Sequence, residues 1–351
     1  MKCKTRAAAL LMSAAMVFSL VACGADTSWV AEHDGEKMSA GVYILSEIDA
    51  YYDALDKAPD EVTSPKDVMK AQIDGKTGSQ YITERAVEYV KQFYTIEKLF
   101  NEKGLSFSEE TEQNITKNTD YLWEYSQEFY ERNGISKQAV STLNRNLYKS
   151  DMLFFDLYGE GGERTVGDSE IEDYYVSTRA RVRYIPFAFF DQSKMEMLPD
   201  EEKAKVEEKA NSYFERAKAG EDMNDLIAEY ETEQNGGTAP HEHTPGMHDA
   251  IIKETSLSPS SDFVKEMFSA PIGEVKLFSD STSYYVAVKV DPLADDRSDF
   301  ENNHAKLLQE MKKDEFDQYL IEQSKDVQVT FNDAAIKRYT PEKLKFDEPE
   351  E

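Results

Sequence analysis

Cysteine is almost absent from this sequence, and its scarcity limits the chemistry open to the chain. Cys3 and Cys23 are the two cysteines among 351 residues, and both lie close to the N-terminus. The rest of the chain therefore forms no disulfide, supplies no thiolate nucleophile and offers no thiolate to a metal. We expect a hydrophobic core to hold the folded part together, and a chain of this length has room for two or three lobes.

Positive charge is also scarce. The chain has 40 lysines and arginines against 69 aspartates and glutamates, which gives a formal net charge of −29 at pH 7. Such a surface repels nucleic-acid phosphates and anionic lipid headgroups, so we expect no nucleic-acid partner. The excess of acid predicts a well-solvated surface, and whether it also selects basic client proteins stays open.

A hydrophobic run long enough to cross a membrane is missing as well. Residues 7–20 carry no charge, but a spanning helix needs about 20 apolar residues. A basic start precedes the run, at Lys2, Lys4 and Arg6. A basic segment followed by a short apolar one is typical of an export signal.

The end of this run resembles a bacterial lipobox. Its residues are Leu20-Val21-Ala22-Cys23, an aliphatic residue and two branched or small ones before a cysteine. We predict a signal peptide over 1–22, a lipid on Cys23 and a tether over 23–28. Several acyl chains on one cysteine give a stable anchor, which places the chain outside the cell, on the outer face of the cytoplasmic membrane. The alternative is an ordinary signal peptide with a chance cysteine.

Helical periodicity dominates the first half of the mature chain. A strand is predicted at 29–33, and a polar loop or partly helical insertion at 57–79. Apolar residues at helical spacing predict helices over 41–56 and 80–102. A polar helix that ends at residue 133 follows, and then another helix over 135–158. Ser106 and Glu109 have the spacing of a capping box, and Asp168 is predicted to cap a short helix that extends to residue 175.

The pattern changes near residue 179. Alternating and β-branched residues predict strands over 181–187 and 283–290. Helices are predicted between these two strands, at 201–218, 225–230 and 263–269. A long helix over 299–323 and a strand over 327–329 follow. The fold class is thus α+β, with a mostly helical lobe and a small α+β unit.

Several short segments resemble, in the same order, those of the PrsA and SurA group of extracytoplasmic foldases. They are Val30–Ser39, Asn133-Gly134-Ile135-Ser136, Val166–Tyr175, Lys218–Met223, Asn235-Gly236-Gly237, Phe263 with Phe268, and Ile272–Val275. The resemblance implies a helical chaperone lobe over 29–177, an inserted parvulin-like domain over 178–292, a segment over 293–346 that completes the lobe, and an acidic tail over 347–351.

The resemblance also assigns site positions, and there the sequence departs from the family. Active parvulins carry two central histidines, and Tyr184 and Tyr285 stand in their places. The active-site Asp or Cys of the family falls near Glu233, and Phe263 matches the phenylalanine of the proline pocket. Two interpretations stay open for the tyrosines: a packed pair that shares hydrogen bonds, or a changed catalytic network with Glu233. Phe263 is either a pocket residue or plain core.

Three of the five histidines lie together, at His241, His243 and His248. Imidazoles at this spacing could bind zinc or copper, but short histidine-rich tracts are only a compositional hint. We expect a solvated loop here, with no metal and no cofactor.

These observations predict a membrane-anchored foldase that binds unfolded or partly folded exported proteins. Aromatic residues of the helical lobe would form the apolar binding surface, with candidates at Tyr43, Tyr89, Phe93, Tyr94, Phe129 and Tyr130. One alternative is a working peptidyl-prolyl isomerase. Another is a solute-binding lipoprotein of a transporter, which would need two α/β lobes with βαβ units.

Overall fold

The structure, a computed structural model, describes residues 26–191, 194–244, 246–293 and 297–346. Cys23 and the predicted signal peptide lie outside these ranges. Two compact units divide the chain, Met1–Asp151 with Leu320–Glu351, and Met152–Tyr319. This division does not decide the domain limits predicted at 178 and 292, which stay a prediction. No helix within the described ranges is long and apolar enough to span a bilayer.

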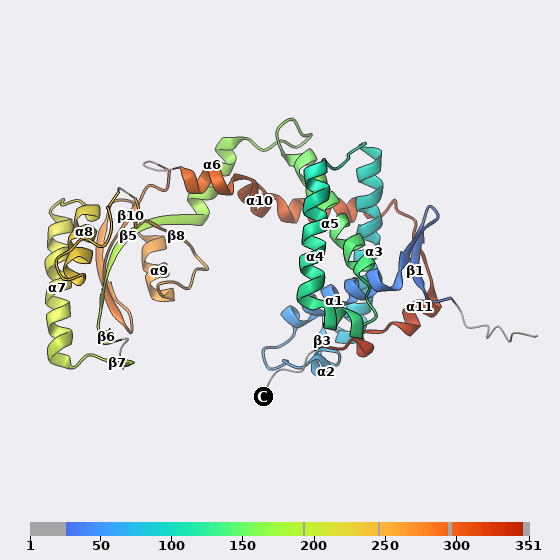
Figure 1. Ribbon diagram of the computed structural model, residues 1–351, viewed down its shortest axis with the longest axis horizontal. Helices are drawn as coiled ribbons and strands as arrows, with labels where there is room; N and C mark the ends of the chain where they lie inside the picture. Colours follow the sequence, from blue (N-terminus) through green and yellow to red (C-terminus); the bar gives the residue numbers. More distant parts are fainter. Residues whose placement is uncertain (1–25, 192–193, 245, 294–296, 347–351) are drawn as a thin grey trace, which may run out of the picture. The chain divides into compact units, whose positions relative to one another are not determined.

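The first unit combines helices with a small sheet (Figure 1). Its sheet has the antiparallel order β11-β1-β2, formed by β1 (Trp29–His33), β2 (Glu36–Ser39) and β11 (Thr330–Phe331). The helices are α1 (Ala40–Lys57), α2 (Pro65–Val68), α3 (Gly78–Glu102), α4 (Glu109–Arg132) and α11 (Asp333–Arg338), with the hairpin β3 (Gln72–Ile73) and β4 (Lys76–Thr77) and the 3-10 turn η1 (Pro341–Lys343). Strand β11 shows how the C-terminal segment completes this unit, because it pairs with β1.

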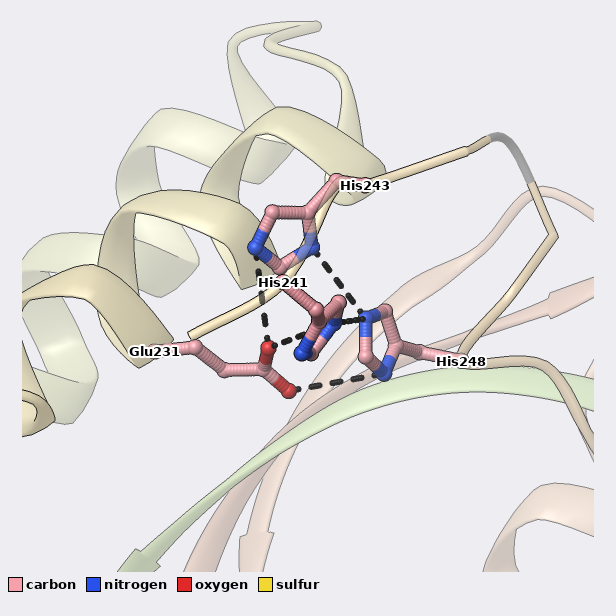
Figure 2. Close-up of side chains that lie close together, drawn as sticks. All are labelled: Glu231, His241, His243 and His248. Atoms are coloured by element: carbon pink, nitrogen blue, oxygen red, sulfur yellow. Dashed lines mark hydrogen bonds and ion pairs between the residues drawn. The ribbon is translucent and has the colours of Figure 1, made fainter. Parts of the chain in front are cut away.

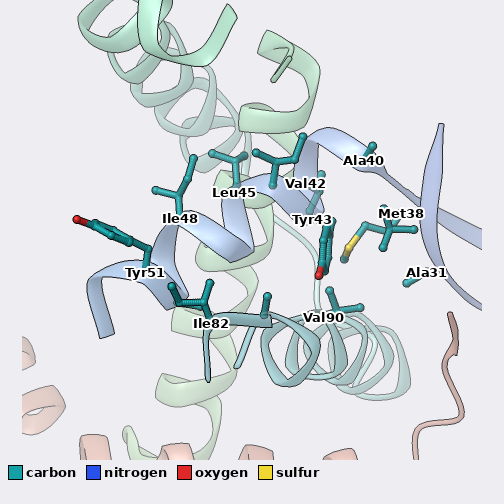
Figure 3. Packing of buried hydrophobic residues seen from close by; sticks show 14 of the residues in the cluster. Ala31, Met38, Ala40, Val42, Tyr43, Leu45, Ile48, Tyr51, Ile82 and Val90 are labelled. Carbon is teal, nitrogen blue, oxygen red and sulfur yellow. The ribbon is translucent and has the colours of Figure 1, made fainter. Parts of the chain in front are cut away.

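The core of the first unit lies where α1 packs on α3 and on the sheet (Figure 3). Apolar side chains recur along one face of each helix, as a 3.6-residue period requires. The buried residues labelled in the figure are Ala31, Met38, Ala40, Val42, Tyr43, Leu45, Ile48, Tyr51, Ile82 and Val90. Burial of this set supplies the cohesion that disulfides would otherwise give.

The second unit contains a four-stranded antiparallel sheet in the order β8-β5-β10-β9. Its strands are β5 (Arg179–Ala188), β8 (Ala250–Lys253), β9 (Val275–Ser279) and β10 (Ser283–Val290), and a hairpin is formed by β6 (Phe190–Asp191) and β7 (Glu196–Met197). Its helices are α6 (Asp168–Thr178), α7 (Asp200–Lys218), α8 (Met223–Gln234) and α9 (Ser261–Ser269). Helices α5 (Lys137–Tyr158) and α10 (Ser298–Ser324) each have residues in both units.

The two faces of this sheet bury different side chains. Helices α7 and α8 cover one face and α9 covers the other (Figure 1). Because side chains alternate along a strand, Ile185 and Phe187 of β5 pack toward α7 and α8, whereas Val182 and Tyr184 pack toward α9. The predicted α+β class is confirmed.

Several local predictions were wrong. Helix α4 begins two residues later than the predicted capping box requires, because its N-cap is Ser108 rather than Ser106, and Ser108 accepts from the N–H of Thr111. The N-cap of α6 is Gly167, so Asp168 is the first helical residue. The last strand lies at Thr330–Phe331 rather than at 327–329.

Candidate functional site

Tyr184 and Tyr285 lie on the same face of the second unit's sheet. In the antiparallel register, Tyr184 is opposite Ala287 and Tyr285 is opposite Pro186. Their ring centroids are 6.1 Å apart. Phe263 of α9 packs on both, with centroid distances of 4.7 Å to Tyr184 and 5.0 Å to Tyr285. The structure therefore brings three of the four predicted site residues together.

This cluster is closed. Phe263 is 0% exposed and Tyr285 is 3% exposed, whereas Tyr184 is half-buried. Phe278 adds a fourth ring, with its centroid 5.5 Å from that of Tyr285. A phenylalanine without exposed surface contacts no peptide in this conformation, so these rings have the packing of a core.

The Tyr285 hydroxyl is committed to a neighbouring carboxylate. It donates to Oδ2 of Asp280 over 2.9 Å. Burial and this hydrogen bond raise the pKa of Tyr285 to about 12. Burial alone would raise the pKa of Asp280, but hydrogen bonds from Thr282, Ser260, Tyr285 and Ser283 lower it to about 2. Near neutral pH this pair is a phenol that donates to an ionised carboxylate, and neither group is poised to exchange a proton.

Glu233 lies elsewhere in the same unit. It belongs to α8, on the face of the sheet opposite to α9, and its carboxylate binds Nζ of Lys209 from α7. The arrangement therefore separates Glu233 from the tyrosines. Asp280, which the sequence did not single out, is the acidic residue that contacts Tyr285.

An open groove occurs in the first unit. It has a volume of about 1170 Å³ and runs between α1 and the C-terminal half of α4, where the backbone of Ser126 is non-helical. Its lining from α1 includes Leu45, Ile48, Tyr51, Tyr52 and Leu55, and its lining from α4 and the C-terminal segment includes Tyr125, Phe129, Tyr130 and Phe346. A concave surface of this size, lined by aromatic rings, is typical of a binding site.

The rings of this groove combine a packed floor with exposed edges. Phe346 stacks on Tyr51 with centroids 4.0 Å apart. By contrast, Tyr52 is 53% exposed and Tyr125 is 81% exposed. Exposed tyrosines beside a fixed aromatic floor offer apolar contact and a hydroxyl to a partner.

The sequence identified part of this surface. Phe129 and Tyr130 line the groove, whereas Tyr43 and Tyr94 are buried in the core. Tyr125 was missed. The sequence does contain a signal for it, because Tyr125 follows Tyr121 by four residues, and the two rings stack in the structure. Two large rings at i and i+4 on an otherwise polar helix indicate an exposed aromatic stripe.

The chain is similar to solved protein structures but matches no protein family by sequence. No protein-family model matches the chain, and no curated protein matches it. Solved structures of foldase protein PrsA are similar. The chain is 14% identical to that of Streptococcus pneumoniae, with a TM-score of 0.33 over 73% of this chain and 88% of that one. The chain is 13% identical to the protein from Lactococcus lactis, with a TM-score of 0.36 over 89% of this chain and 99% of that one.

A peptidylprolyl isomerase (PrsA) structure from Bacillus cereus is 20% identical, with a TM-score of 0.26 over 81% of this chain and 99% of that chain. The predicted resemblance to PrsA-type proteins is confirmed at this level of similarity.

Proposed function

We propose that this chain is an extracytoplasmic foldase, anchored through a lipid on Cys23, that binds unfolded or partly folded exported proteins. The groove between α1 and α4 is the observation that carries the proposal. Unfolded chains expose aromatic and aliphatic segments, and an open aromatic surface binds such segments with little sequence selectivity.

The rim of the groove favours clients with positive charge. Acidic side chains at Asp49, Glu124, Glu128 and Glu131 stand among its lining residues, with Arg132 as the basic one. Their carboxylates would attract lysine and arginine near the apolar segments of a client, and would repel acidic segments. The proposed client is therefore an extended segment with apolar side chains flanked by basic ones.

We propose further that residues 178–292 form a parvulin-like domain with little or no prolyl isomerase activity. A prolyl isomerase accelerates rotation about the peptide bond before proline. This catalysis needs an open apolar pocket for the proline ring and polar groups beside the twisted amide. The closed packing of Phe263 and the commitment of Tyr285 to Asp280 support the inactive assignment. In this proposal Tyr184, Glu233 and Tyr285 occupy the family's catalytic positions without a catalytic role.

The solute-binding alternative has less support. Two α/β lobes with βαβ units would contain parallel strands. Among the described residues, every strand pairing is antiparallel.

The experiment measures how the mature chain slows the aggregation of an unfolded client without ATP. The double variant Tyr52→Ser/Tyr125→Ser removes exposed rings from the groove. We expect it to lose most of the protection while its unfolding midpoint stays close to that of the wild type, because exposed side chains contribute little to stability.

Leu257→Ser is the matched control, because Leu257 is 81% exposed, as Tyr125 is, and lies in the other unit. Full protection by the groove variant, or an equal loss in the control, would contradict the proposal.

A further inference from the structure

The histidine-rich segment is folded around a carboxylate rather than spread as a solvated loop. Figure 2 shows the side chains of His241, His243 and His248 converging on Glu231, which lies one turn before the end of α8. One ligand atom from each of the four side chains can be chosen so that all lie within 4.8 Å of one another. The sequence pattern pointed to the three histidines but not to their acidic partner.

The distances within this cluster are those between ligands of one small ion. Nε2 of His248 is 3.1 Å from Nε2 of His241 and 3.2 Å from Nδ1 of His243. Nε2 of His241 is 3.4 Å from Oε2 of Glu231. A tetrahedral zinc ion with bonds of about 2.0–2.2 Å separates its ligand atoms by roughly 3.3–3.6 Å. Three of the six separations are thus close to those of such a coordination shell, and all six are within 4.8 Å.

Hydrogen bonds among the three rings do not give every polar atom of the cluster a partner. Each ring nitrogen carries either one hydrogen or one lone pair. Nε2 of His248 therefore makes at most one well-formed bond, although two imidazole nitrogens approach it. Oε2 of Glu231 and Nε2 of His243 are buried and make no hydrogen bond among the described residues, although they lie 3.7 Å apart, within ion-pair range when the ring is protonated. A cation would bind the converging lone pairs and the carboxylate together.

The segment is also fixed at two points, one between its second and third histidines and one directly after His248. The N–H of Gly246 donates to Oδ1 of Asn224, at the start of α8, over 3.3 Å. Asp249, which follows His248, is bound by Nε of Arg183 over 2.7 Å and leads into β8. Because these anchors hold the histidines near α8, a metal would find its ligands preorganised.

We propose that Glu231, His241, His243 and His248 form a binding site for one divalent transition-metal ion, with zinc as the ion that fits best. Three imidazoles and one carboxylate suit zinc at tetrahedral geometry, and four protein ligands make a closed, structural site. The ion would tie His241, His243 and His248 to Glu231 of α8. This inference is independent of the proposed foldase function.

The test is zinc binding by the full mature chain, purified without a histidine tag and treated with a chelator. Competition with a chromophoric zinc indicator should give one tight site per chain. Even residues that only orient metal ligands contribute about 10–100-fold to affinity. We therefore expect the double variant His243→Ala/His248→Ala to lower the affinity for zinc by about 100-fold or more.

His304→Ala is the matched control, because His304 also faces a carboxylate, with Nε2 3.2 Å from Oδ1 of Asp168. It should bind zinc as the wild type does. Binding of cobalt in place of zinc reports the coordination geometry through its visible absorption spectrum. We expect the intense absorption of tetrahedral cobalt from the wild type and from His304→Ala, but not from the double variant. Zinc should also raise the unfolding temperature of the same two proteins and leave that of the double variant unchanged. Substoichiometric binding, or equal affinity in the double variant, would overturn the proposal.

Discussion

At the scale of residues, the proposed lack of isomerase activity rests on two tyrosines. An imidazole passes hydrogen bonds through two nitrogens, whereas a phenol has one hydroxyl. In Tyr285 that hydroxyl donates to Asp280, and the ring packs against Phe263 and Phe278. In the proposed account, these packed rings leave no open pocket for a proline ring.

This packing predicts little or no acceleration of prolyl isomerisation. Uncatalysed rotation faces a barrier of about 20 kcal/mol and takes tens of seconds, so even weak catalysis is measurable with a proline tetrapeptide and a proline-limited refolding protein. We expect the wild type, Tyr184→Phe and Tyr285→Phe to give the uncatalysed rate. Robust activity that falls in either variant would instead establish the tyrosine-based isomerase.

Glu47 gives a second prediction at this scale. Its side chain is buried in the first unit, and burial raises its pKa to about 8. An acid whose folded pKa lies above its unfolded value stabilises the fold fully below the unfolded pKa, near 4.5, and this contribution is lost as pH rises through 8. A tenfold change in a proton-binding constant corresponds to about 1.4 kcal/mol of folding free energy.

We therefore expect Glu47→Gln to stabilise the chain relative to the wild type as pH rises from 5 to 8.5. The measurement is the urea midpoint at each pH, and the difference between the two proteins isolates Glu47 from the many exposed acids. A constant difference over this range would show that Glu47 keeps an ordinary pKa.

Sequence reasoning found the residues of the second unit's sheet better than their partners. Tyr184, Tyr285 and Phe263 were assigned through the resemblance to the parvulin family, and the strands and the short helix that carry them were predicted from the residue pattern. Asp280 and Glu231 were missed because loop geometry and the end of α8 place them, and neither carries a local signal.

At the scale of elements, the groove depends on how α1 and α4 end. The backbone departs from helical geometry at Ser126, and Phe346 from the C-terminal segment stacks on Tyr51. Long periodic helices such as α3 and α5 were predicted within a few residues. The short strands β8 and β9 were missed, because strands of four or five residues are recognisable mainly through the strands with which they pair.

The acidic rim of the groove predicts a charge preference among clients. Two peptides with the same apolar centre, one flanked by lysines and the other by glutamates, provide the comparison. We expect tighter binding of the lysine-flanked peptide, measured by fluorescence anisotropy. The difference should be smaller at high salt, because the Debye length falls from about 10 Å at 0.1 M salt to about 3 Å at 1 M salt. Equal affinities at low salt would remove the role assigned to Glu124, Glu128 and Glu131.

At the scale of the whole molecule, the N-terminal and C-terminal segments form one unit and the middle of the chain forms the other. From the sequence, the C-terminal segment was expected to return to the helical lobe, and the pairing of β11 with β1 places one of its strands beside the first strand of the chain. The limits between the two units fall within α5 and α10, where a continuous helical pattern gives no break in the sequence. The domain limits at 178 and 292 stay a prediction.

The anchor is a property of the whole chain and is tested in cells. Cys23→Ala removes the predicted acceptor, so we expect labelled palmitate to enter the wild-type protein and not the variant. The variant should remain uncleaved or be shed from the membrane. Label in the variant would mean that another residue carries the lipid.

The central claim, that clients bind in the groove of the first unit, is tested most directly by site-specific cross-linking. A photoreactive amino acid replaces Tyr125 in one protein and Leu257 in the other, two positions with equal exposure in different units. With a permanently unfolded exported protein as client, we predict strong cross-linking from position 125 and little from position 257. Cross-linking from position 257 alone would contradict the account.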